Sequence, residues 1–300
     1  MLPSAGFQLP EGASILIATS MKICQTIEEM RAACRLVRGS GRRLGFVPTM
    51  GALHEGHLSL VRAGRASCGA VAASIFVNPT QFGPKEDLAK YPRNFERDCQ
   101  FLEKEGVEVL FAPSVEEMYP AGSVTWVTVE GLSERLDGRS RPGHFRGVTT
   151  VVAKLFHIVE PDAAFFGQKD AAQVTIIRRM VQDMNFAVEI VACPIVREAD
   201  GLAMSSRNVY LNSDQRKQAL VLHRSLLRVR KMWEGGERDA ARLAAGGREE
   251  MAGEKTVRLD YFEIVDASNL DAVADVVGGA LVAVAAWVGE TRLIDNVLLP

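Results

Sequence analysis

Residues 48–57 read Pro-Thr-Met-Gly-Ala-Leu-His-Glu-Gly-His and join a short apolar run, residues 44–47, to a helical pattern. An apolar run of this length is typical of a buried strand, and the spaced apolar residues that follow are typical of an amphipathic helix. The first turn of a helix carries unpaired backbone N–H groups and a partial positive charge, which favour phosphate. The glycines let the backbone approach a ligand, and His54 and His57 can donate hydrogen bonds to phosphate oxygens. The stretch therefore predicts a strand-to-helix turn that binds a nucleoside triphosphate.

The two histidines also allow other interpretations. They lie three residues apart and could chelate a metal ion, but no nearby cysteine or carboxylate cluster completes a zinc site, and Glu55 alone adds little. A pair of histidines near a turn is also a common feature of ordinary polar surface. The position between a strand and a helix favours the nucleotide interpretation over both.

Composition places the chain among ordinary globular proteins. Its 300 residues fit one large or two modest domains, and 47% hydrophobic with 24% charged residues argues against disorder. The net charge of −2 provides no general attraction to nucleic acid or to an anionic membrane, and no apolar run reaches the ~20 residues that a membrane span needs. We therefore expect neither nucleic acid nor a membrane as a partner.

Two features concern cellular location. The five cysteines are scattered and never occur as Cys-x-x-Cys, which argues against a disulfide framework and favours a reducing cytoplasm. Residues 1–20 lack the basic start of a signal peptide and precede the first helical pattern. We expect these residues to be a dispensable N-terminal extension, or to result from an upstream start codon.

Strand-like and helix-like segments alternate through residues 21–195. Strands are expected at residues 44–49, 71–77, 108–112, 163–166 and 189–193, and helices at residues 58–68, 95–105, 148–159 and 171–184. Short, almost fully apolar strands between helices predict a parallel sheet covered on both faces. We therefore predict an α/β fold with a Rossmann-like, doubly wound domain, which binds ligands beyond the carboxyl ends of its strands.

The pattern changes after residue 195. A long helix is expected from Ser213 to the pair Gly235-Gly236, followed by a helix at residues 239–251 and strands at residues 257–265 and 281–288. These segments predict a smaller α+β domain over residues 196–300.

Residues 78–83, Asn-Pro-Thr-Gln-Phe-Gly, follow the second expected strand. A turn alone would explain the proline and the glycine. Gln81 carries both a donor and an acceptor, so it can also recognise a hydroxyl and a carboxylate together.

Residues 139–147, Arg-Ser-Arg-Pro-Gly-His-Phe-Arg-Gly, hold three arginines and a histidine. Such a segment can bind phosphate or carboxylate, and it can equally be a solvated loop before the next helix. Both interpretations remain open at this point.

Two further polar segments are candidates for the phosphate site. Gly167-Gln168-Lys169-Asp170 follows an apolar strand and opens a helix, so we expect Lys169 near the phosphates and Gln173, one turn later, in the same cleft. Alternatively, Asp170 serves only as a helix N-cap. Residues 204–208, Met-Ser-Ser-Arg-Asn, lie where the two domains should meet, and their hydroxyls and guanidinium suit triphosphate oxygens, although alone they would be an ordinary loop.

Together these segments closely resemble the pantoate–β-alanine ligase family, a member of the H-x-G-H nucleotidyltransferase superfamily. The matching pieces are PTMGALHEGH, SIFVNPTQFG, RPGHFRG, FGQKDAAQ, VREADGLAMSSRN and AAWVGETRLIDN, in that order from about Met21 to the C-terminus. The resemblance implies a homodimer with a Rossmann-like N-terminal domain and a smaller C-terminal domain that closes over the site. One departure is Gln168, where relatives often carry Glu.

The reaction that the resemblance implies has two steps. Pantoate attacks the α-phosphorus of Mg-ATP to give pantoyl adenylate and pyrophosphate, and the amine of β-alanine then attacks the activated acyl group to give pantothenate and AMP. A carboxylate is already ionised at pH 7, so the first step needs no general base. ATP with Mg²⁺ serves as a substrate, and no tightly bound organic cofactor is expected.

The resemblance also assigns residues to roles. His57 is the catalytic position, assisted by His54 and Lys169; Gln81 and Gln173 hold pantoate, and Gln81 also lies near β-alanine. Mg²⁺ rides mainly on the phosphates, with Asp98 as a further candidate ligand. The expected ATP contacts are Met50, Gly51, Ala52, Leu53, His54, Glu55, Gly56, His57, Gly167, Gln168, Lys169, Asp170, Val196, Met204, Ser205, Ser206 and Arg207. For the gem-dimethyl group of pantoate, we expect an apolar wall from Met50 and Phe82.

Other functions compete with this one. Another H-x-G-H adenylyltransferase would transfer AMP to a phosphate, and the neutral amides of Gln81 and Gln173 at the acceptor site argue against it. The short length and the missing basic RNA-binding domain disfavour a tRNA synthetase. A non-catalytic nucleotide-binding module would keep the phosphate cradle but would not need the acceptor glutamines.

Overall fold

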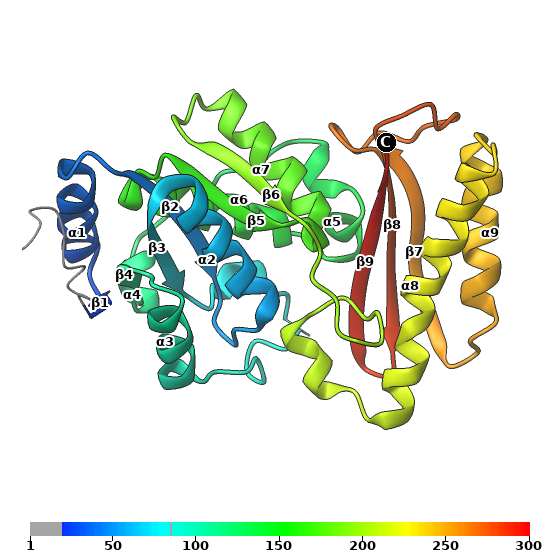
Figure 1. Ribbon diagram of the computed structural model, residues 1–300, viewed down its shortest axis with the longest axis horizontal. Coiled ribbons are helices and arrows are strands. Elements are labelled where there is room, and N and C mark those ends of the chain that lie inside the picture. Colours follow the sequence, from blue (N-terminus) through cyan, green and yellow to red (C-terminus); the bar gives the residue numbers. More distant parts are fainter. Residues whose placement is uncertain (1–19, 85) are drawn as a thin grey trace, which may run out of the picture.

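The computed structural model describes residues 20–84 and 86–300. A six-stranded parallel sheet with helices on both faces lies beside a three-stranded antiparallel sheet (Figure 1). The strands are β1 (Lys22–Cys24), β2 (Arg43–Thr49), β3 (Gly69–Ile75), β4 (Val109–Phe111), β5 (Ala163–Gly167), β6 (Glu189–Cys193), β7 (Val257–Asp266), β8 (Ala280–Val288) and β9 (Thr291–Leu299). The α-helices are α1 (Ile27–Gly39), α2 (Glu55–Cys68), α3 (Phe95–Lys104), α4 (Val115–Met118), α5 (Asp137–Ser140), α6 (His144–Val159), α7 (Ala171–Asp183), α8 (Ser213–Glu234) and α9 (Ala240–Ala252). The 3₁₀ turns are η1 (Pro79–Gln81), η2 (Leu132–Glu134), η3 (Gln168–Asp170) and η4 (Ser206–Tyr210).

The order of the large sheet places its ligand crevice. The strands run β1-β4-β3-β2-β5-β6, so the chain proceeds from β2 toward one edge through β3 and β4, then returns to the other side of β2 as β5. This reversal makes the boundary of β2 and β5, where Gly45 pairs with Ala163, the topological switch point. Ligands of doubly wound sheets bind beyond the carboxyl ends of such strands. The segments after β2 and β5 are the two that hold His57 and Lys169.

Alternating side chains bury both faces of this sheet. Phe46 and Phe111 belong to a core shared with α1, α6 and α7, whereas Val47 and Leu110 belong to a core on the face of α2. Side chains of neighbouring strand residues point to opposite faces, so strands that are apolar at every position require cover on both sides. The predicted Rossmann-like, doubly wound sheet is therefore confirmed.

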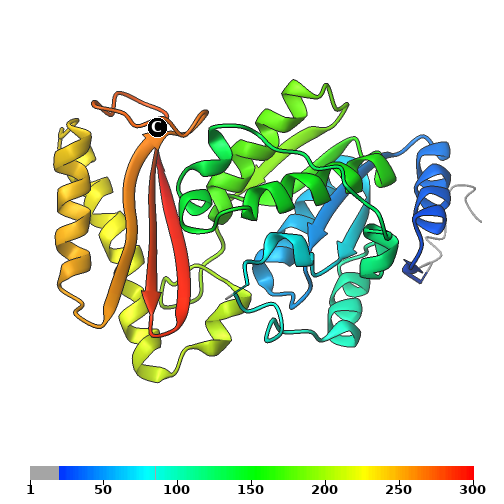
Figure 2. The ribbon, with the colours of Figure 1, turned by 180° about the vertical axis from the view of Figure 1, so that it is seen from behind.

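The smaller sheet is also covered on both faces. One face packs on α8 and α9, and the other faces the N-terminal domain (Figure 2). Val282 and Val284 of β8 join the core under α8 and α9, while Ala283 and Ala285 join the core that contains α6 and α7. The antiparallel sheet of the predicted α+β domain therefore forms part of the N-terminal domain's core.

The structure differs from the sequence prediction mainly at element boundaries. Helix α2 begins at Glu55 rather than at residue 58, so His57 lies in its first turn, and α6 begins at His144 rather than at residue 148. Strands β1 and β9 were not predicted. The expected N-terminal extension falls outside the described residues except for residue 20. All five cysteines are free, and none of the helices in residues 20–84 and 86–300 is long and apolar enough to cross a membrane.

Candidate active site

The turn after β2 has an uncommon backbone conformation. Gly51 and Ala52 have positive φ angles of 77° and 51°, and a left-handed conformation costs a residue with a side chain about 1–2 kcal/mol. Asp98 of α3 offsets this cost, because its carboxylate accepts the N–H groups of Ala52 at 2.7 Å and Leu53 at 2.9 Å. Its side chain is 1% exposed. We therefore assign Asp98 to the turn rather than to Mg²⁺, since both of its oxygens bind backbone.

The two histidines close the start of α2. His54 is the N-cap, and its Nδ1 accepts the N–H of Gly56 at 3.2 Å; Nδ1 of His57 accepts the N–H of His54 at 3.4 Å. The ring centroids lie 4.1 Å apart. A neutral imidazole that accepts at Nδ1 carries its proton on Nε2. The site therefore presents two Nε2–H donors, and the histidines cap two backbone N–H groups that we expected to face phosphate.

Burial keeps both imidazoles neutral. Burial, aided by the nearby charge of Lys169, lowers the pKa of His54 to about 4. Burial also lowers the pKa of His57 well below its ordinary value, and His54 and Lys169 add to this effect. Nζ of Lys169 lies 3.5 Å from a carboxylate oxygen of Asp170. The site thus combines two neutral donors with one ammonium group, which is a suitable set for a phosphate chain.

The amide of Gln81 has a fixed orientation. Its Oε1 accepts a hydrogen bond from Nδ2 of Asn78 at 3.0 Å, and its Nε2 lies 3.2 Å from the sulfur of Met50. Asn78 is itself held, since Tyr119 donates to its Oδ1 at 3.0 Å. Asn78 thus fixes the direction of the Gln81 carbonyl, and one N–H of the amide faces the Met50 sulfur, so the orientation of the donor and the acceptor that we expected Gln81 to offer is set by its neighbours. Sequence reasoning missed Asn78, although an asparagine directly before a proline is a recognisable N-cap.

The arginine-rich segment, residues 139–147, holds the Gln81 loop in place. Arg141 forms a two-pronged ion pair with Glu86, at 2.6 and 2.8 Å. The imidazole of His144 donates from Nδ1 to the backbone oxygen of Gln81 at 2.9 Å, and Arg141 donates to its Nε2. Arg139 pairs with Glu263 of the other domain. These contacts bind Arg141 and His144 to the Gln81 loop, whereas Arg139 and Arg146 are exposed, so the anion site and the solvated loop both stay predictions for those two arginines.

The turn after β5 brings Lys169 to the histidines. Residues Gln168–Asp170 form the 3₁₀ turn η3, and α7 follows directly. Asp170 occupies the N-cap position of α7 but its side chain makes no capping hydrogen bond, so the interpretation of Asp170 as only a cap is wrong. Gln173 lies half-buried in the first turn of α7, one helical turn after Lys169.

The segment from Met204 to Arg207 meets the turn after β2. The N–H of Met204 donates to the backbone oxygen of Val196 at 3.0 Å, and Oγ of Ser206 lies 3.4 Å from the backbone oxygen of Ala52. Ser205 caps the short helix η4. Arg207 binds both carboxylate oxygens of Asp87 at 2.9 Å through Nε and Nη2, which leaves Nη1 for the phosphate role that we expected.

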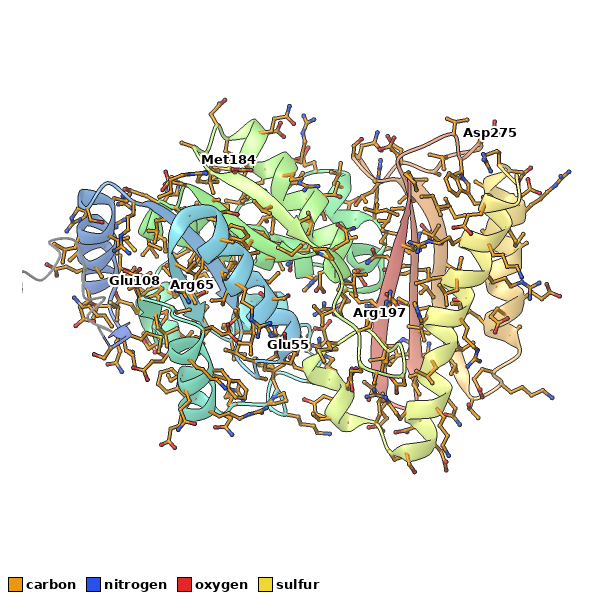
Figure 3. The ribbon with its side chains drawn as sticks, viewed as in Figure 1. Glu55, Arg65, Glu108, Met184, Arg197 and Asp275 are labelled. Atoms are coloured by element: carbon orange, nitrogen blue, oxygen red, sulfur yellow. The ribbon has the colours of Figure 1, made fainter. Side chains whose placement is uncertain are left out.

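Two residues that we expected to contact ATP, Glu55 and Leu53, direct their side chains elsewhere. Glu55 lies on the surface at the start of α2 and pairs with Arg62 (Figure 3). Leu53 is buried in the core under α2. Each residue retains only backbone groups for a nucleotide. Across the described parts of the chain, residues 20–84 and 86–300, no group of three or more His, Cys, Asp or Glu side chains is arranged to hold a metal ion.

Comparisons with known proteins agree on one family. The model of the family described as "Pantoate-beta-alanine ligase" matches residues 22–298. A pantothenate synthetase of Koribacter versatilis is 60% identical over 93% of this chain and 96% of its own length, and one of Acidobacterium capsulatum is 62% identical over 93% and 97%. The crystal structure of pantothenate synthetase from Thermus thermophilus superimposes with a TM-score of 0.88 at 49% identity, covering 93% of this chain and 99% of that one.

A second solved structure carries ligands. Pantoate-β-alanine ligase from Francisella tularensis, crystallised with β-γ ATP and β-alanine, has a TM-score of 0.75 and 33% identity, covering 93% of this chain and 98% of that one.

Proposed function

The chain belongs to the pantoate–β-alanine ligase family, and we propose that the crevice between β2 and β5 is where it condenses pantoate with β-alanine, using ATP. The observation that carries this placement is the meeting of three segments at the switch point: the histidine turn, the Lys169 turn and the Met204–Arg207 segment. The Francisella complex supports ATP and β-alanine as substrates.

The first step joins pantoate to AMP. An oxygen of the pantoate carboxylate attacks the α-phosphorus, a new P–O bond forms, and the bond to pyrophosphate breaks. The Nε2–H groups of His54 and His57 donate to phosphate oxygens as negative charge builds up, and Lys169 neutralises part of that charge. Because both histidines are neutral, they donate without first taking up a proton.

The second step releases AMP. The amine of β-alanine attacks the acyl carbon, a C–N bond forms, the acyl–oxygen bond to AMP breaks, and the amine gives up a proton to water. Gln81, whose amide orientation Asn78 fixes, donates from its NH₂ group to an oxygen of the acyl substrate. Met50, whose sulfur lies beside that amide, and Phe82 supply the apolar wall for the gem-dimethyl group, and Gln173 binds pantoate from α7.

Mg²⁺ accompanies ATP in this scheme. The residues around the crevice offer N–H donors and an ammonium group rather than a set of oxygen ligands, so we assign the ion to the phosphates, where it neutralises charge and keeps several waters.

We also propose that the protein is a homodimer in the cytoplasm. The family resemblance supports the dimer, and five free cysteines fit a reducing compartment. Light scattering after gel filtration tests the dimer: twice the chain mass of 32.7 kDa supports it, and a single-chain mass excludes it.

The direct test of the activity follows pyrophosphate and AMP with ATP, Mg²⁺ and pantoate, with and without β-alanine. We expect sustained release of both products, together with pantothenate, only when both acids are present. ATP binding without any pantoate-dependent release would instead indicate another adenylyltransferase or a binding module.

A further inference from the structure

The mechanism leaves one segment of the family resemblance without a role, the pair Asp295-Asn296 in the middle of β9. Both residues are 3% exposed, which is uncommon for an acid and an amide. In the register of the sheet, Asp295 lies opposite Val284 and Asn296 opposite Ala283. Val284 belongs to the core under α8, and Ala283 to the core shared with the N-terminal domain. The two side chains therefore point to opposite faces of the sheet.

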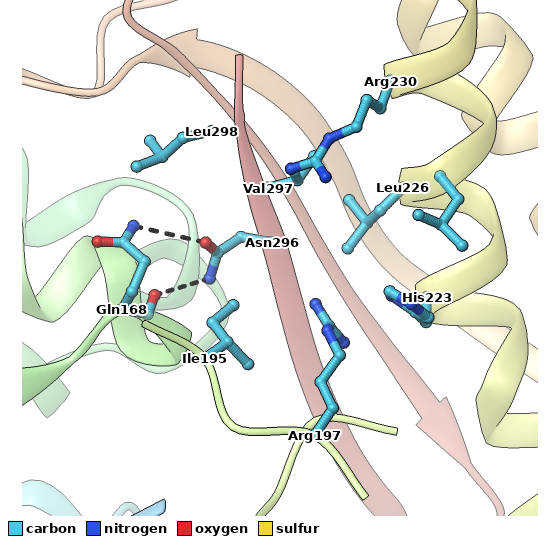
Figure 4. A pocket seen from close by; sticks show the side chains of 10 residues that line it. Gln168, Ile195, Arg197, His223, Leu226, Arg230, Asn296, Val297 and Leu298 are labelled. Carbon is cyan, nitrogen blue, oxygen red and sulfur yellow. Dashed lines mark hydrogen bonds between the residues drawn. The ribbon is translucent and has the colours of Figure 1, made fainter. Parts of the chain in front are cut away.

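Asn296 holds the Lys169 turn from the far side of the domain boundary. Its Nδ2 donates to the backbone oxygens of Gln168 and Lys169, both at 2.9 Å, and its Oδ1 lies 3.5 Å from Nε2 of Gln168 (Figure 4). One amide group thus fixes two consecutive carbonyls of η3. Because the backbone of Lys169 is held, the direction in which its ammonium group leaves the turn is also restricted.

Asp295 holds the other nucleotide segment. Its carboxylate binds both terminal nitrogens of Arg197, at 2.7 and 2.9 Å, and Arg197 also donates to the backbone oxygen of Gly201 at 3.1 Å. Arg197 pairs with Ala203 across a tight hairpin, and Met204 follows directly. The position of Asp295 therefore sets the hairpin that leads into the Met204–Arg207 segment.

A hydrogen bond from the backbone of Asn296 also connects Asn296 to the side chain of Asp295. The N–H of Asn296 donates to Oδ1 of Asp295 at 2.8 Å. The Lys169 turn, Asn296, Asp295, Arg197 and the hairpin thus form one continuous chain of partly buried contacts. A hydrogen-bond network in which each member has a partner restricts the positions of all its members.

We propose that Asp295 and Asn296 are positioning residues that set the Lys169 turn and the Met204–Arg207 segment at a fixed spacing for ATP. The proposal rests on the proposed function, in which both segments bind the nucleotide. Neither residue touches substrate. The C-terminal domain thereby contributes to catalysis by placing Lys169 and the Met204–Arg207 segment.

A merely structural role at the domain interface is the alternative, and the chain offers a matched control. Arg292, also on β9, binds Asp137 of the N-terminal domain at 2.7 Å, and Asp137 is buried as well. Neither residue bonds the Lys169 turn or the Met204–Arg207 segment among the described contacts. Asp137→Asn therefore loosens the same interface without touching the nucleotide segments.

The first experiment compares steady-state kinetics of Asn296→Ala, Asn296→Ser and Asp137→Asn. A cavity of about 290 Å³, lined in part by Gln168, Arg197 and Asn296, gives water access to the truncated site and favours a folded variant. We expect Asn296→Ala to lower kcat/KM for ATP roughly tenfold, the loss for two hydrogen bonds, with the KM for pantoate unchanged. Asn296→Ser keeps one donor and should lose less. Asp137→Asn should lower the melting temperature without this ATP-specific loss.

A double-mutant cycle with Lys169→Ala separates the positioning role of Asn296 from the phosphate role of Lys169. If Asn296 acts through Lys169, Asn296→Ala should cost much less in the Lys169→Ala background than in the wild type. Fully additive losses, or equal losses in Asp137→Asn, would overturn the positioning role while leaving the function intact. If Lys169→Ala alone leaves ATP kinetics unchanged, the assignment of Lys169 to the phosphate site fails instead. Should Asn296→Ala not fold, Asn296→Ser carries the same cycle.

Discussion

At the scale of single residues, the structure restricts what each polar group can do. Gln81 illustrates this: its sequence neighbourhood indicated a substrate contact, but the atom available to substrate depends on Asn78. An amide that can rotate freely could bind either a donor or an acceptor on the substrate. With its carbonyl fixed by Asn78, Gln81 presents its NH₂ group in a set direction, and both the carboxylate and the hydroxyl of pantoate offer an oxygen to it.

Asn78→Asp tests this restriction. The substitution keeps the shape of the side chain but removes the NH₂ group that holds Gln81 and the backbone oxygen of Gly147. We expect the KM for pantoate to rise about tenfold, because the Gln81 amide is then free to turn, while the KM for ATP changes little. Tyr119→Phe serves as the control, since it removes a bond on the other side of Asn78. Equal effects on both substrates would argue against the assignment.

His144 makes the free energy of unfolding depend on pH. Burial, followed by the charge of Arg141, lowers the pKa of His144 in the folded protein to about 4. Between the unfolded value near 6.5 and this value, the unfolded chain binds the additional proton, so the free energy of unfolding falls as the pH falls. We expect the contribution between pH 7 and pH 5 to be on the order of 1–2 kcal/mol.

Urea unfolding of the wild type and of His144→Asn at several pH values measures this contribution. Asparagine retains a donor for the Gln81 backbone oxygen but does not titrate. The variant should therefore lose less stability on acidification than the wild type, although His54 and His57 still contribute in the same direction. Parallel curves for the two proteins would contradict the role of His144.

At the scale of elements, the turn between β2 and α2 depends on a helix that is distant in sequence. Asp98 reaches from α3 to the N–H groups of Ala52 and Leu53 and stabilises two consecutive left-handed residues. Asp98→Asn replaces one acceptor with a donor that faces a backbone N–H. We expect a loss of stability of about 1–3 kcal/mol together with reduced activity, but no change in the Mg²⁺ concentration that half-saturates the reaction.

Denaturant titration and an Mg²⁺ titration of the activity check both parts. Asp214→Asn, which alters an exposed carboxylate in the first turn of α8, is a suitable control and should change neither. A large shift in the Mg²⁺ requirement of Asp98→Asn would indicate that Asp98 is a ligand of Mg²⁺.

The strands and helices also show how much of the fold could be predicted from the sequence alone. The strands β2, β3, β5 and β6 are long enough for an apolar run to reveal them, and their order with the helices predicted the doubly wound sheet. Strand β1 has three residues, too few for a pattern. Strand β9 contains Arg292, Asp295 and Asn296, whose polarity hides the strand because their partners lie on other elements. The contacts on which the proposed role of Asp295 and Asn296 depends also lie on other elements, so the sequence alone did not single them out.

At the scale of the whole molecule, the two domains form one packed body. Neighbouring residues of β8 belong to different cores, so separating the domains would expose apolar surface on both. We therefore expect a single cooperative transition in calorimetry, with equal calorimetric and van't Hoff enthalpies per cooperative unit. Two separate transitions would contradict the shared core.

In the proposed mechanism, the whole fold delivers two neutral imidazole donors and Lys169 to the phosphates of ATP. Rapid-quench measurement of pantoyl adenylate formation in a single turnover, with ATP affinity determined separately, tests it most directly. For His57→Ala we predict a rate at least about 100-fold lower with a nearly unchanged Kd for ATP, because the hydrogen bond strengthens in the transition state. His157→Ala, on the exposed side of α6, should behave like the wild type. An unchanged rate in His57→Ala would contradict the account.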